Sequence, residues 1–158
     1  MVQVVDTCIW KPFEFRATEP NALRIALIHQ ANCFNTMGTG IAKDVRERYP
    51  AAWEADIQTQ RGLKTKLGTF SNAEVIPNRF ICNMYGQYHY GRDKRYTDYE
   101  AVYTALGDIK FWAEGYDIGC LLIPHLMGCR NAGGDWLVIR AMIDSHFKDN
   151  PTVLICKK

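Results

Sequence analysis

Two glycine-containing loops hold most of the residues that could do chemistry in this chain. The first runs from His29 to Ala42 and reads His-Gln-Ala-Asn-Cys-Phe-Asn-Thr-Met-Gly-Thr-Gly-Ile-Ala. An apolar stretch of strand length precedes it, and residues 41–49 carry apolar side chains at helical spacing after it. A helix start offers free N–H groups, and glycines let the main chain approach a ligand closely. The pattern predicts a phosphate or nucleotide site, with His29 as a candidate proton carrier.

The first loop matches neither of the two common phosphate-binding motifs. No Gly-Lys-Ser/Thr ends it, and the third glycine of the dinucleotide fingerprint is missing. A tight turn that needs glycine would explain its Gly-x-Gly equally well. A second loop is therefore needed to support a ligand site.

The second loop has the same surroundings as the first. The apolar stretch 118–124 precedes it, residues 125–136 form it, and an amphipathic helix is expected over 136–147. Two such loops, each after a strand, are typical of an open α/β sheet that holds a diphosphate. Asp135 could cap the second helix or act as an acid/base group. The sequence leaves both roles open.

These motifs resemble those of the macro domain family, most closely the ADP-ribose-1″-phosphate phosphatases found in yeast and phages. The first loop is similar, residue for residue, to His-x-x-Asn-Cys-x-x-x-x-Gly-x-Gly-Ile-Ala. The second loop keeps Gly128 and residues 132–136 of a family loop that reads Gly-x-Gly-Leu-Ala-Gly-Gly-Asp-Trp. The phage-type members are also similar over residues 87–93 and at Tyr96, Asp98, Tyr99 and Glu100.

The resemblance implies an α/β fold, a three-layer α/β/α sandwich with a mixed central sheet, in a single domain over residues 1–158. The diphosphate of ADP-ribose would lie between the two loops, and the distal ribose would lie by Asn32. Asp6 would accept a hydrogen bond from the adenine amine or be an ordinary turn residue. The expected ligand-binding residues are Asp6, Asn32, Gly38, Thr39, Gly40, Ile41, Ala42, Gly128, Cys129, Arg130, Asn131, Ala132 and Gly133.

The expected catalytic residues are His29, Asn32 and Asp135. His29 would exchange a proton with water or the leaving sugar oxygen, since histidine titrates near neutral pH; alternatively it is a core histidine. Asn32 would hydrogen-bond ribose hydroxyls or simply hold its turn. Tyr88, His89 and Tyr90 would close over the ribose or form an ordinary loop, and His125 and His146 are expected to be structural.

The expected function is hydrolysis of ADP-ribose 1″-phosphate to ADP-ribose and phosphate, with no metal and no cofactor. One alternative is an ADP-ribosyl hydrolase that acts on modified macromolecules, and another is a non-catalytic ADP-ribose reader. Two departures from the family bear on this choice. The branch that cleaves glutamate esters uses a lysine absent from residues 81–85, and its aspartate falls at Ala132. Arg130-Asn131 replaces the usual Gly-Leu, so Arg130 would either pair with a phosphate or obstruct the loop.

Composition limits the possible partners and compartment. The net charge of +2 over 158 residues is too mild for a nucleic-acid groove, so no stable nucleic-acid binding is expected. No apolar stretch of membrane-spanning length and no signal peptide is found, so neither a membrane partner nor secretion is expected. Six scattered cysteines without a Cys-x-x-Cys pair predict free thiols in a cytoplasmic protein.

The elements that must position these residues follow from apolar periodicity. Residues 11–21 are expected to form a polar connection. The expected strands are 2–9, 23–30, 67–76, 79–84, 118–123 and 152–156, and the expected helices are 38–49, 51–60, 96–112 and 135–147.

Overall fold

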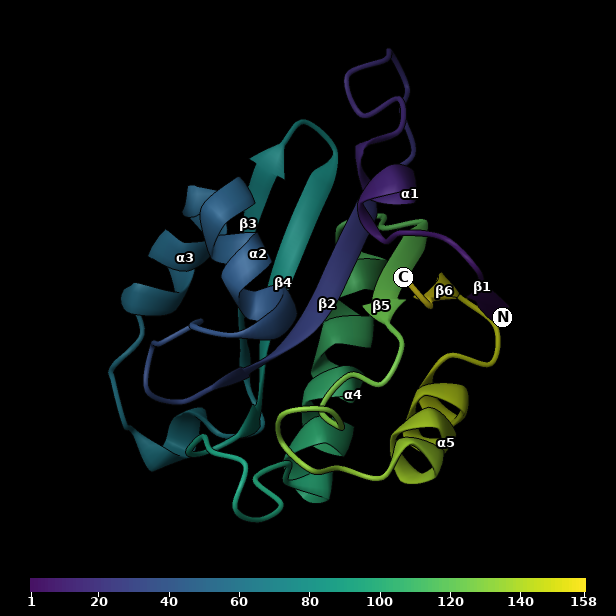
Figure 1. Ribbon diagram of the computed structural model, residues 1–158. Coiled ribbons are helices and arrows are strands. Elements are labelled where there is room, and N and C mark those ends of the chain that lie inside the picture. The colour runs from purple at the N-terminus through teal and green to yellow at the C-terminus, as the bar shows by residue number, and fades with distance from the viewer.

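A six-stranded sheet runs through the middle of the computed structural model, which describes residues 1–158. Its strands are β1 (Val2–Val5), β2 (Ile25–Asn32), β3 (Phe70–Ile76), β4 (Arg79–Gln87), β5 (Cys120–Pro124) and β6 (Thr152–Cys156) (Figure 1). The helices are α1 (Trp10–Glu14), α2 (Gly40–Arg48), α3 (Pro50–Ile57), α4 (Tyr99–Gly115) and α5 (Trp136–His146), with a 3-10 turn η1 (Lys64–Lys66).

The strand order is β1-β6-β5-β2-β4-β3, and only β3 runs antiparallel to its neighbour. The expected mixed sheet is therefore confirmed. Because the other strands are parallel, their carboxyl ends meet at one edge. The loops that follow β2, β4 and β5 lie together at the lower end of the sheet in Figure 1. This edge is where the two glycine loops meet.

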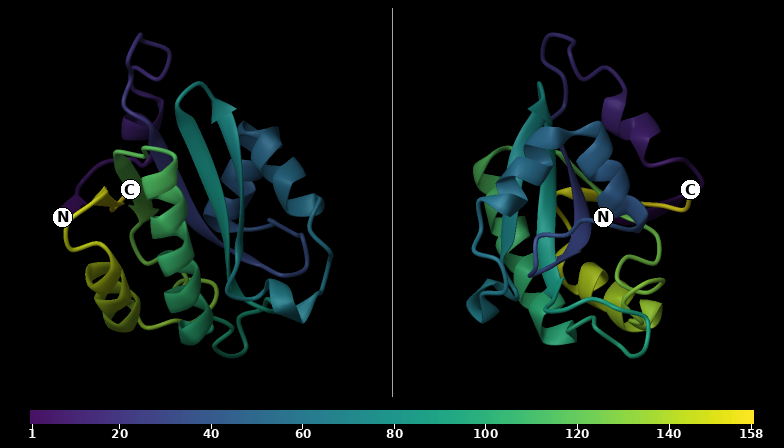
Figure 2. Two further views of the ribbon diagram at one scale, coloured as in Figure 1. Left: turned by 180° about the vertical axis from the view of Figure 1, so that it is seen from behind. Right: turned by 60° about the vertical axis from the view of Figure 1, so that its left-hand side comes forward.

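Helices cover both faces of the sheet, which gives the expected α/β/α sandwich (Figure 2). One cluster of 19 buried residues joins the sheet to α4 and α5, and a second cluster of 12 lies on the side of α1, α2 and α3. Along β2 the side chains alternate between these layers. Ala26 and Ile28 belong to the first cluster and Leu27 to the second. The same alternation directs His29 toward the second layer.

The segment 11–21, expected to be a polar connection, instead contains part of α1. Trp10 and Phe13 are buried on this short helix, and Pro12 lies in its first turn, where proline is tolerated. Five residues are too few for a helical period to stand out in the sequence. Strand β4 also continues past its expected end at 84, which carries Gln87 to the carboxyl edge of the sheet.

Two expectations from composition concern the cysteines and the membrane. All six cysteines are free, as expected. None of the helices combines the length and the apolar character that crossing a bilayer would require.

Candidate ligand site at the carboxyl edge of the sheet

A cavity of about 670 Å³ lies at the carboxyl edge of the sheet. Its volume falls within the range typical of small-molecule sites. Both glycine loops contribute to its wall, together with the ends of four strands. The lining consists of residues 8–10, 30–32, 36–42, 44, 87, 90–92, 124–128, 130–132 and 156–158.

Asn32 lines this cavity at the end of β2. Its Oδ1 accepts a hydrogen bond from the Phe34 N–H (2.8 Å), and its Nδ2 donates to Thr36 Oγ1 (2.6 Å). The side chain therefore holds its own turn, which was one of its two expected roles. Its contact with a ribose stays a prediction.

The start of α2 is open toward the same cavity. Thr39, the residue before the helix, is extended and makes no capping hydrogen bond through its side chain. The first N–H groups of a helix have no partner within the helix, and they carry the positive end of its dipole. Residues 38–42, all expected to bind the ligand, line the cavity here. This combination favours an anion.

The second loop contributes Gly128, Arg130, Asn131 and Ala132 to the lining, as expected. Gly128 has a φ of +74°, and a Cβ built there would lie 2.6 Å from Gln30 Oε1, so a larger residue would strain the backbone and displace the Gln30 side chain. Cys129 and Gly133, also expected to bind the ligand, do not line the cavity. Cys129 packs against the α4–α5 core.

Gly133 lies close to a different part of the chain. A Cβ at this glycine would lie 3.2 Å from Arg95 Cα. Arg95 belongs to the loop between β4 and α4. Ligand contacts at Cys129 and Gly133 therefore stay predictions, while the structure gives both residues packing contacts.

Asn131 connects three loops around the cavity. Its Oδ1 accepts a hydrogen bond from Arg92 Nη2 at 2.9 Å. Its Nδ2 lies 3.1 Å from the position that a Cβ on Gly40 would take. The unusual Arg130-Asn131 pair thus places an amide between the loops, while the exposed Arg130 side chain borders the cavity.

Buried Lys66 holds the first loop in place through hydrogen bonds. Its side chain is 5% exposed, and its Nζ donates to the Cys33 carbonyl (3.3 Å) and to Asn35 Oδ1. Burial lowers the pKa of Lys66, whereas nearby Asp56 raises it. The lysine therefore ties the loop between β2 and α2 to the segment that follows α3.

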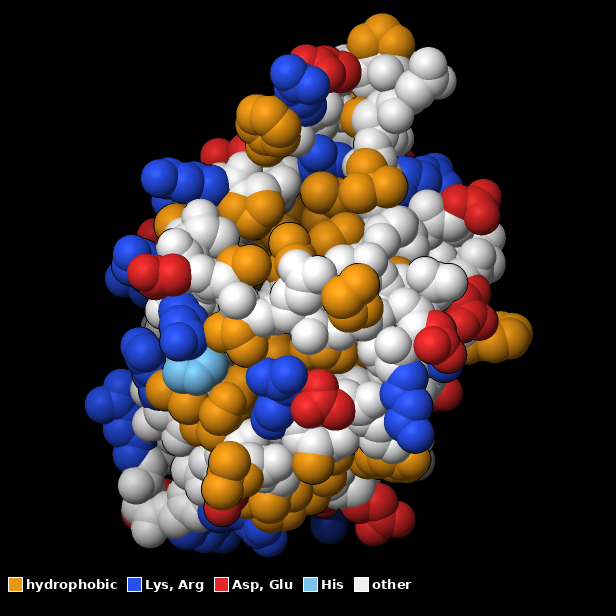
Figure 3. All heavy atoms as spheres, turned by 90° about the vertical axis from the view of Figure 1, so that its right-hand side faces the viewer, with side chains coloured by type: hydrophobic (Ala, Val, Ile, Leu, Met, Phe, Trp, Pro, Cys, Tyr) orange, Lys and Arg blue, Asp and Glu red, His pale blue; other side chains and the backbone are white.

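The charged side chains of the lining are mostly cationic. Arg92, Arg130, Lys157 and Lys158 line the cavity, and Asp44 is the one carboxylate among the lining residues. On the face that carries β1, β6 and α5, Lys and Arg side chains gather along one side, next to a histidine (Figure 3). Clustered charge of one sign in a cleft attracts the opposite charge. The cavity is therefore suited to an anionic ligand.

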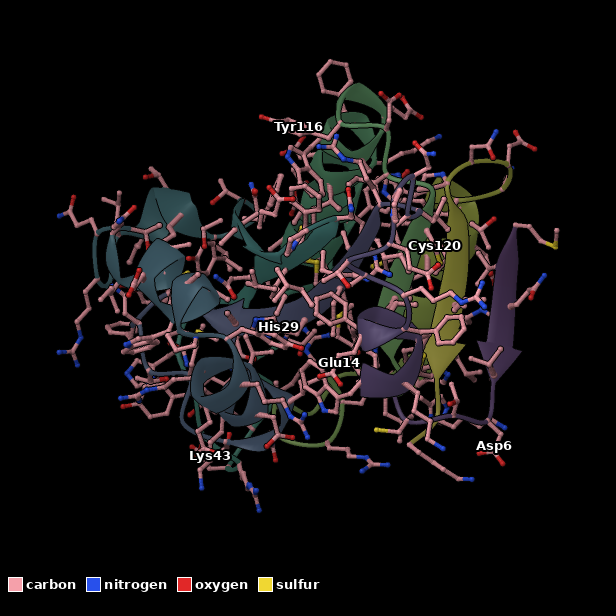
Figure 4. The ribbon with its side chains drawn as sticks, turned by 90° about the horizontal axis from the view of Figure 1, so that it is seen from above. Asp6, Glu14, His29, Lys43, Tyr116 and Cys120 are labelled. Atoms are coloured by element: carbon pink, nitrogen blue, oxygen red, sulfur yellow. The ribbon has the colours of Figure 1, made fainter.

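His29 lies outside this cavity, which does not fit its expected catalytic role. The side chain is fully buried between the sheet and the helices (Figure 4), and its Nε2 lies 2.7 Å from Asn83 Oδ1. Burial lowers its pKa to about 4, against the opposing effect of hydrogen bonds to Asn83 and Gln30. The alternation of β2 explains this position. His29 is a core histidine here, the alternative that its sequence left open.

Asp135 and Asp6 also lie outside the cavity. Asp135 is exposed, and its Oδ1 accepts a hydrogen bond from the Leu137 N–H at 2.8 Å, so it caps α5. Asp6 lies beyond the end of β1 at the edge of the molecule (Figure 4), where its carboxylate pairs with Lys158 at 3.2 Å. Strand β1 ends at Val5 rather than at residue 9, so Asp6 belongs to the segment after the strand, and its contact with an adenine stays a prediction.

Several lining residues received no individual role from the sequence. Among the aromatic residues after β4, Tyr90 lines the cavity and Tyr88 and His89 do not. His125, expected to be purely structural, also lines it. The rule that ligands gather at carboxyl strand ends would have pointed to the residues after β4, β5 and β6. The missed residues include Trp10, Gln30, Gln87, Arg92, His125, Lys157 and Lys158.

No three His, Cys, Asp or Glu side chains gather in a way that could hold a metal ion.

Comparison with known proteins identifies the fold. No protein-family model matches the sequence. A 17.5 kDa protein from the tk-vs intergenic region of Enterobacteria phage T4, described as uncharacterized, is 28% identical over 133 residues, covering 82% of this chain and 84% of its own.

Solved structures are similar over nearly the whole chain. The macrodomain of Mycobacterium tuberculosis DarG has a TM-score of 0.77 at 19% identity, covering 100% of this chain and 98% of its own. A macrodomain protein from Streptomyces coelicolor has a TM-score of 0.73 at 21% identity, covering 100% and 99%. Thermosipho africanus DarTG, solved in complex with ADP-ribose, has a TM-score of 0.72 at 15% identity, covering 99% of this chain and 41% of its own. These similarities show that the chain has the macrodomain fold.

Proposed function

We propose that this chain, which has the macrodomain fold, binds ADP-ribose at the carboxyl edge of its sheet and hydrolyses ADP-ribose 1″-phosphate to ADP-ribose and phosphate. One observation carries the proposal: the uncapped start of α2 and four cationic side chains line the same cavity. The complex of Thermosipho africanus DarTG with ADP-ribose supports the choice of ligand.

The order of segments along the cavity fits an extended ligand with an anionic middle. Strands β6, β5, β2 and β4 follow one another in the sheet, and three spacings of about 4.8 Å give a length of about 14 Å. The two glycine loops follow the middle strands, β5 and β2. The diphosphate would lie between these loops, with the adenosine toward β6 and the distal ribose toward β4.

Arg92 is the proposed contact for the 1″-phosphate. Asn32 and Gln87 are partners in the β2–β4 ladder, and the chain then continues to Arg92 in the loop before α4. Hydrolysis of a phosphate monoester needs a positioned water and stabilisation of the charge on the phosphoryl oxygens. A guanidinium suits this because its planar donors match a phosphate. In this proposal His29 and Asp135 take no direct part in the reaction.

A non-catalytic reader is the second candidate. The observation that favours it is that His29 and Asp135, the two groups expected to transfer protons, lie outside the cavity. A reader needs only the binding surfaces, whereas a hydrolase must also position water. An ADP-ribosyl hydrolase would use the same binding residues, so the test must include an ADP-ribosylated protein as a substrate.

The test compares wild type with Arg92→Gln, using Arg95→Gln from the same loop as a control outside the cavity. Phosphate release from ADP-ribose 1″-phosphate is measured in EDTA, and ADP-ribose binding is measured by calorimetry. We expect wild-type activity to persist in EDTA. Arg92→Gln should lower kcat by about 100-fold, the usual cost of removing a donor to a developing charge.

Each outcome bears on one part of the proposal. Arg95→Gln should retain wild-type kinetics. Wild-type turnover by Arg92→Gln would refute the role of Arg92. Binding of ADP-ribose without release of phosphate would favour the non-catalytic reader. Release of ADP-ribose from the modified protein, without release of phosphate from ADP-ribose 1″-phosphate, would favour the ADP-ribosyl hydrolase. Absence of ADP-ribose binding would refute the whole proposal.

A further inference from the structure

The β6 end of the cavity holds three cations, two of which have no ionic partner. Arg130 comes from the second loop, and Lys157 and Lys158 follow β6 directly. Lys158 pairs with Asp6 at 3.2 Å. Neither Arg130 nor Lys157 takes part in any ion pair of the structure. Two unpaired positive charges therefore remain at this end.

Lys157 is held in place by the sheet and lies apart from the expected diphosphate. Its backbone N–H donates to the Val5 carbonyl at 3.1 Å, which continues the pairing of β1 with β6. Strand β6 lies two places from β2, so their ends are about 10 Å apart. The start of α2 follows β2 and already provides for the diphosphate. The ammonium of Lys157 is thus free to meet another part of an extended ligand.

His125 adds a neutral hydrogen-bonding group to this end. It is the first residue after β5, and its N–H donates to the Cys156 carbonyl at 2.8 Å. Its ring packs edge-on against Trp136, with 5.1 Å between centroids. Burial lowers the pKa of His125, and the nearby charges of Lys157 and Arg130 lower it further. The neutral imidazole offers one donor and one acceptor.

We propose that this end of the cavity, formed by Arg130, Lys157 and His125, binds a phosphate monoester carried by the adenosine ribose of the ligand. A bare ribose hydroxyl would leave both cations without an anion. A phosphate at that hydroxyl pairs with both and accepts hydrogen bonds from them. The inference rests on the proposed function, because it assumes that ADP-ribose lies in this cavity with its adenosine toward β6.

The test is a comparison of ligands by calorimetry. ADP-ribose 2′-phosphate should bind roughly tenfold more tightly than ADP-ribose, because charge-assisted hydrogen bonds are among the stronger ones. The gain should shrink as salt is raised, since both cations are exposed. Adenosine 2′,5′-bisphosphate and adenosine 3′,5′-bisphosphate, compared with AMP, identify the hydroxyl that carries the phosphate.

Variants locate the subsite. Lys157→Gln and Arg130→Gln should each reduce the affinity ratio of the phosphorylated to the plain ligand. Lys148→Gln, which removes an exposed cation outside the cavity, should preserve it. If ADP-ribose binds but neither phosphorylated form gains affinity, the inference is overturned and the proposed function stands. A gain that both variants retain also overturns it. If no ligand binds, both proposals fail.

Discussion

Replacement of His29 by glutamine separates a core histidine from a catalytic one. In the folded protein its side chain is fully buried, and its Nε2 lies 2.7 Å from Asn83 Oδ1. Burial lowers its pKa from 6.5 to about 4. The imidazole is therefore neutral in the folded protein at pH 5, whereas an exposed histidine in the unfolded chain is mostly charged. Glutamine keeps a polar side chain and cannot titrate.

This difference makes stability depend on pH in a defined direction. Between about pH 6.5 and about pH 4 the unfolded chain binds a proton at His29 that the folded chain does not bind. Stability should therefore fall as pH falls through this window. The interval between the two pKa values corresponds to about 3 kcal/mol in total, of which about 2 kcal/mol is lost between pH 7 and about pH 4.5.

The assay is urea unfolding of wild type and His29→Gln at those two pH values, together with phosphate release at pH 7. Other titrating groups, including Asp56 with its raised pKa, are common to both proteins, so the difference between them isolates His29. We expect the variant to lose about 2 kcal/mol less than wild type on acidification. Its kcat should stay near that of wild type.

Two outcomes would contradict this reasoning. Equal loss of stability on acidification in both proteins would refute the argument from burial. A loss of turnover of about 100-fold with intact ADP-ribose binding would restore a catalytic role for His29.

Two further predictions concern the loops. Gly40→Val should abolish the rise in Tm that ADP-ribose produces, because Gly40 has a φ of +56° and a Cβ there would meet Asn131 Nδ2 at 3.1 Å. A circular dichroism spectrum like that of wild type is the control, and a full shift in Tm would place the ligand elsewhere. Asp135→Asn should keep stability within about 1 kcal/mol, since asparagine also caps helices, and should leave phosphate release unchanged. A steep loss of turnover with binding preserved would contradict a role limited to the cap.

Apolar periodicity was sufficient to predict most of the helices and strands, whereas the layered arrangement was predicted from the family resemblance. The strand over 152–156 has the expected bounds, and α5 begins and ends within one residue of the expected helix. A helix buries one stripe of side chains and a strand buries one face. The spacing of apolar residues along the sequence shows both. The position of the first glycine loop at a cavity could also be predicted, because glycine is favoured where a main chain comes close to a ligand.

Which residues at the strand ends line the cavity could not be predicted in the same way. His29 and Asn32 lie in one motif, yet His29 belongs to the core and Asn32 to the cavity. Alternation along β2 places the two side chains on opposite faces of the sheet, but which of these positions borders the cavity depends on loops and helices from distant segments. Arg92 and Lys157 reach the cavity from other loops for the same reason. Spacing along one segment carries no information about these encounters.

The register of β4 has a consequence for how this protein tolerates changes in length. Ala31 pairs with Tyr85 and Asn32 with Gln87, so Gly86 is the extra residue of a bulge. A Cβ on Gly86 would lie 2.7 Å from Gln30 Oε1 and 2.8 Å from Val102 Cγ2. Deleting this one residue would turn the end of β4, at Gln87, to the other face of the sheet. Natural variation at the cavity is therefore expected to arise by substitution beyond Gly86, while insertions and deletions are confined to the loop that follows.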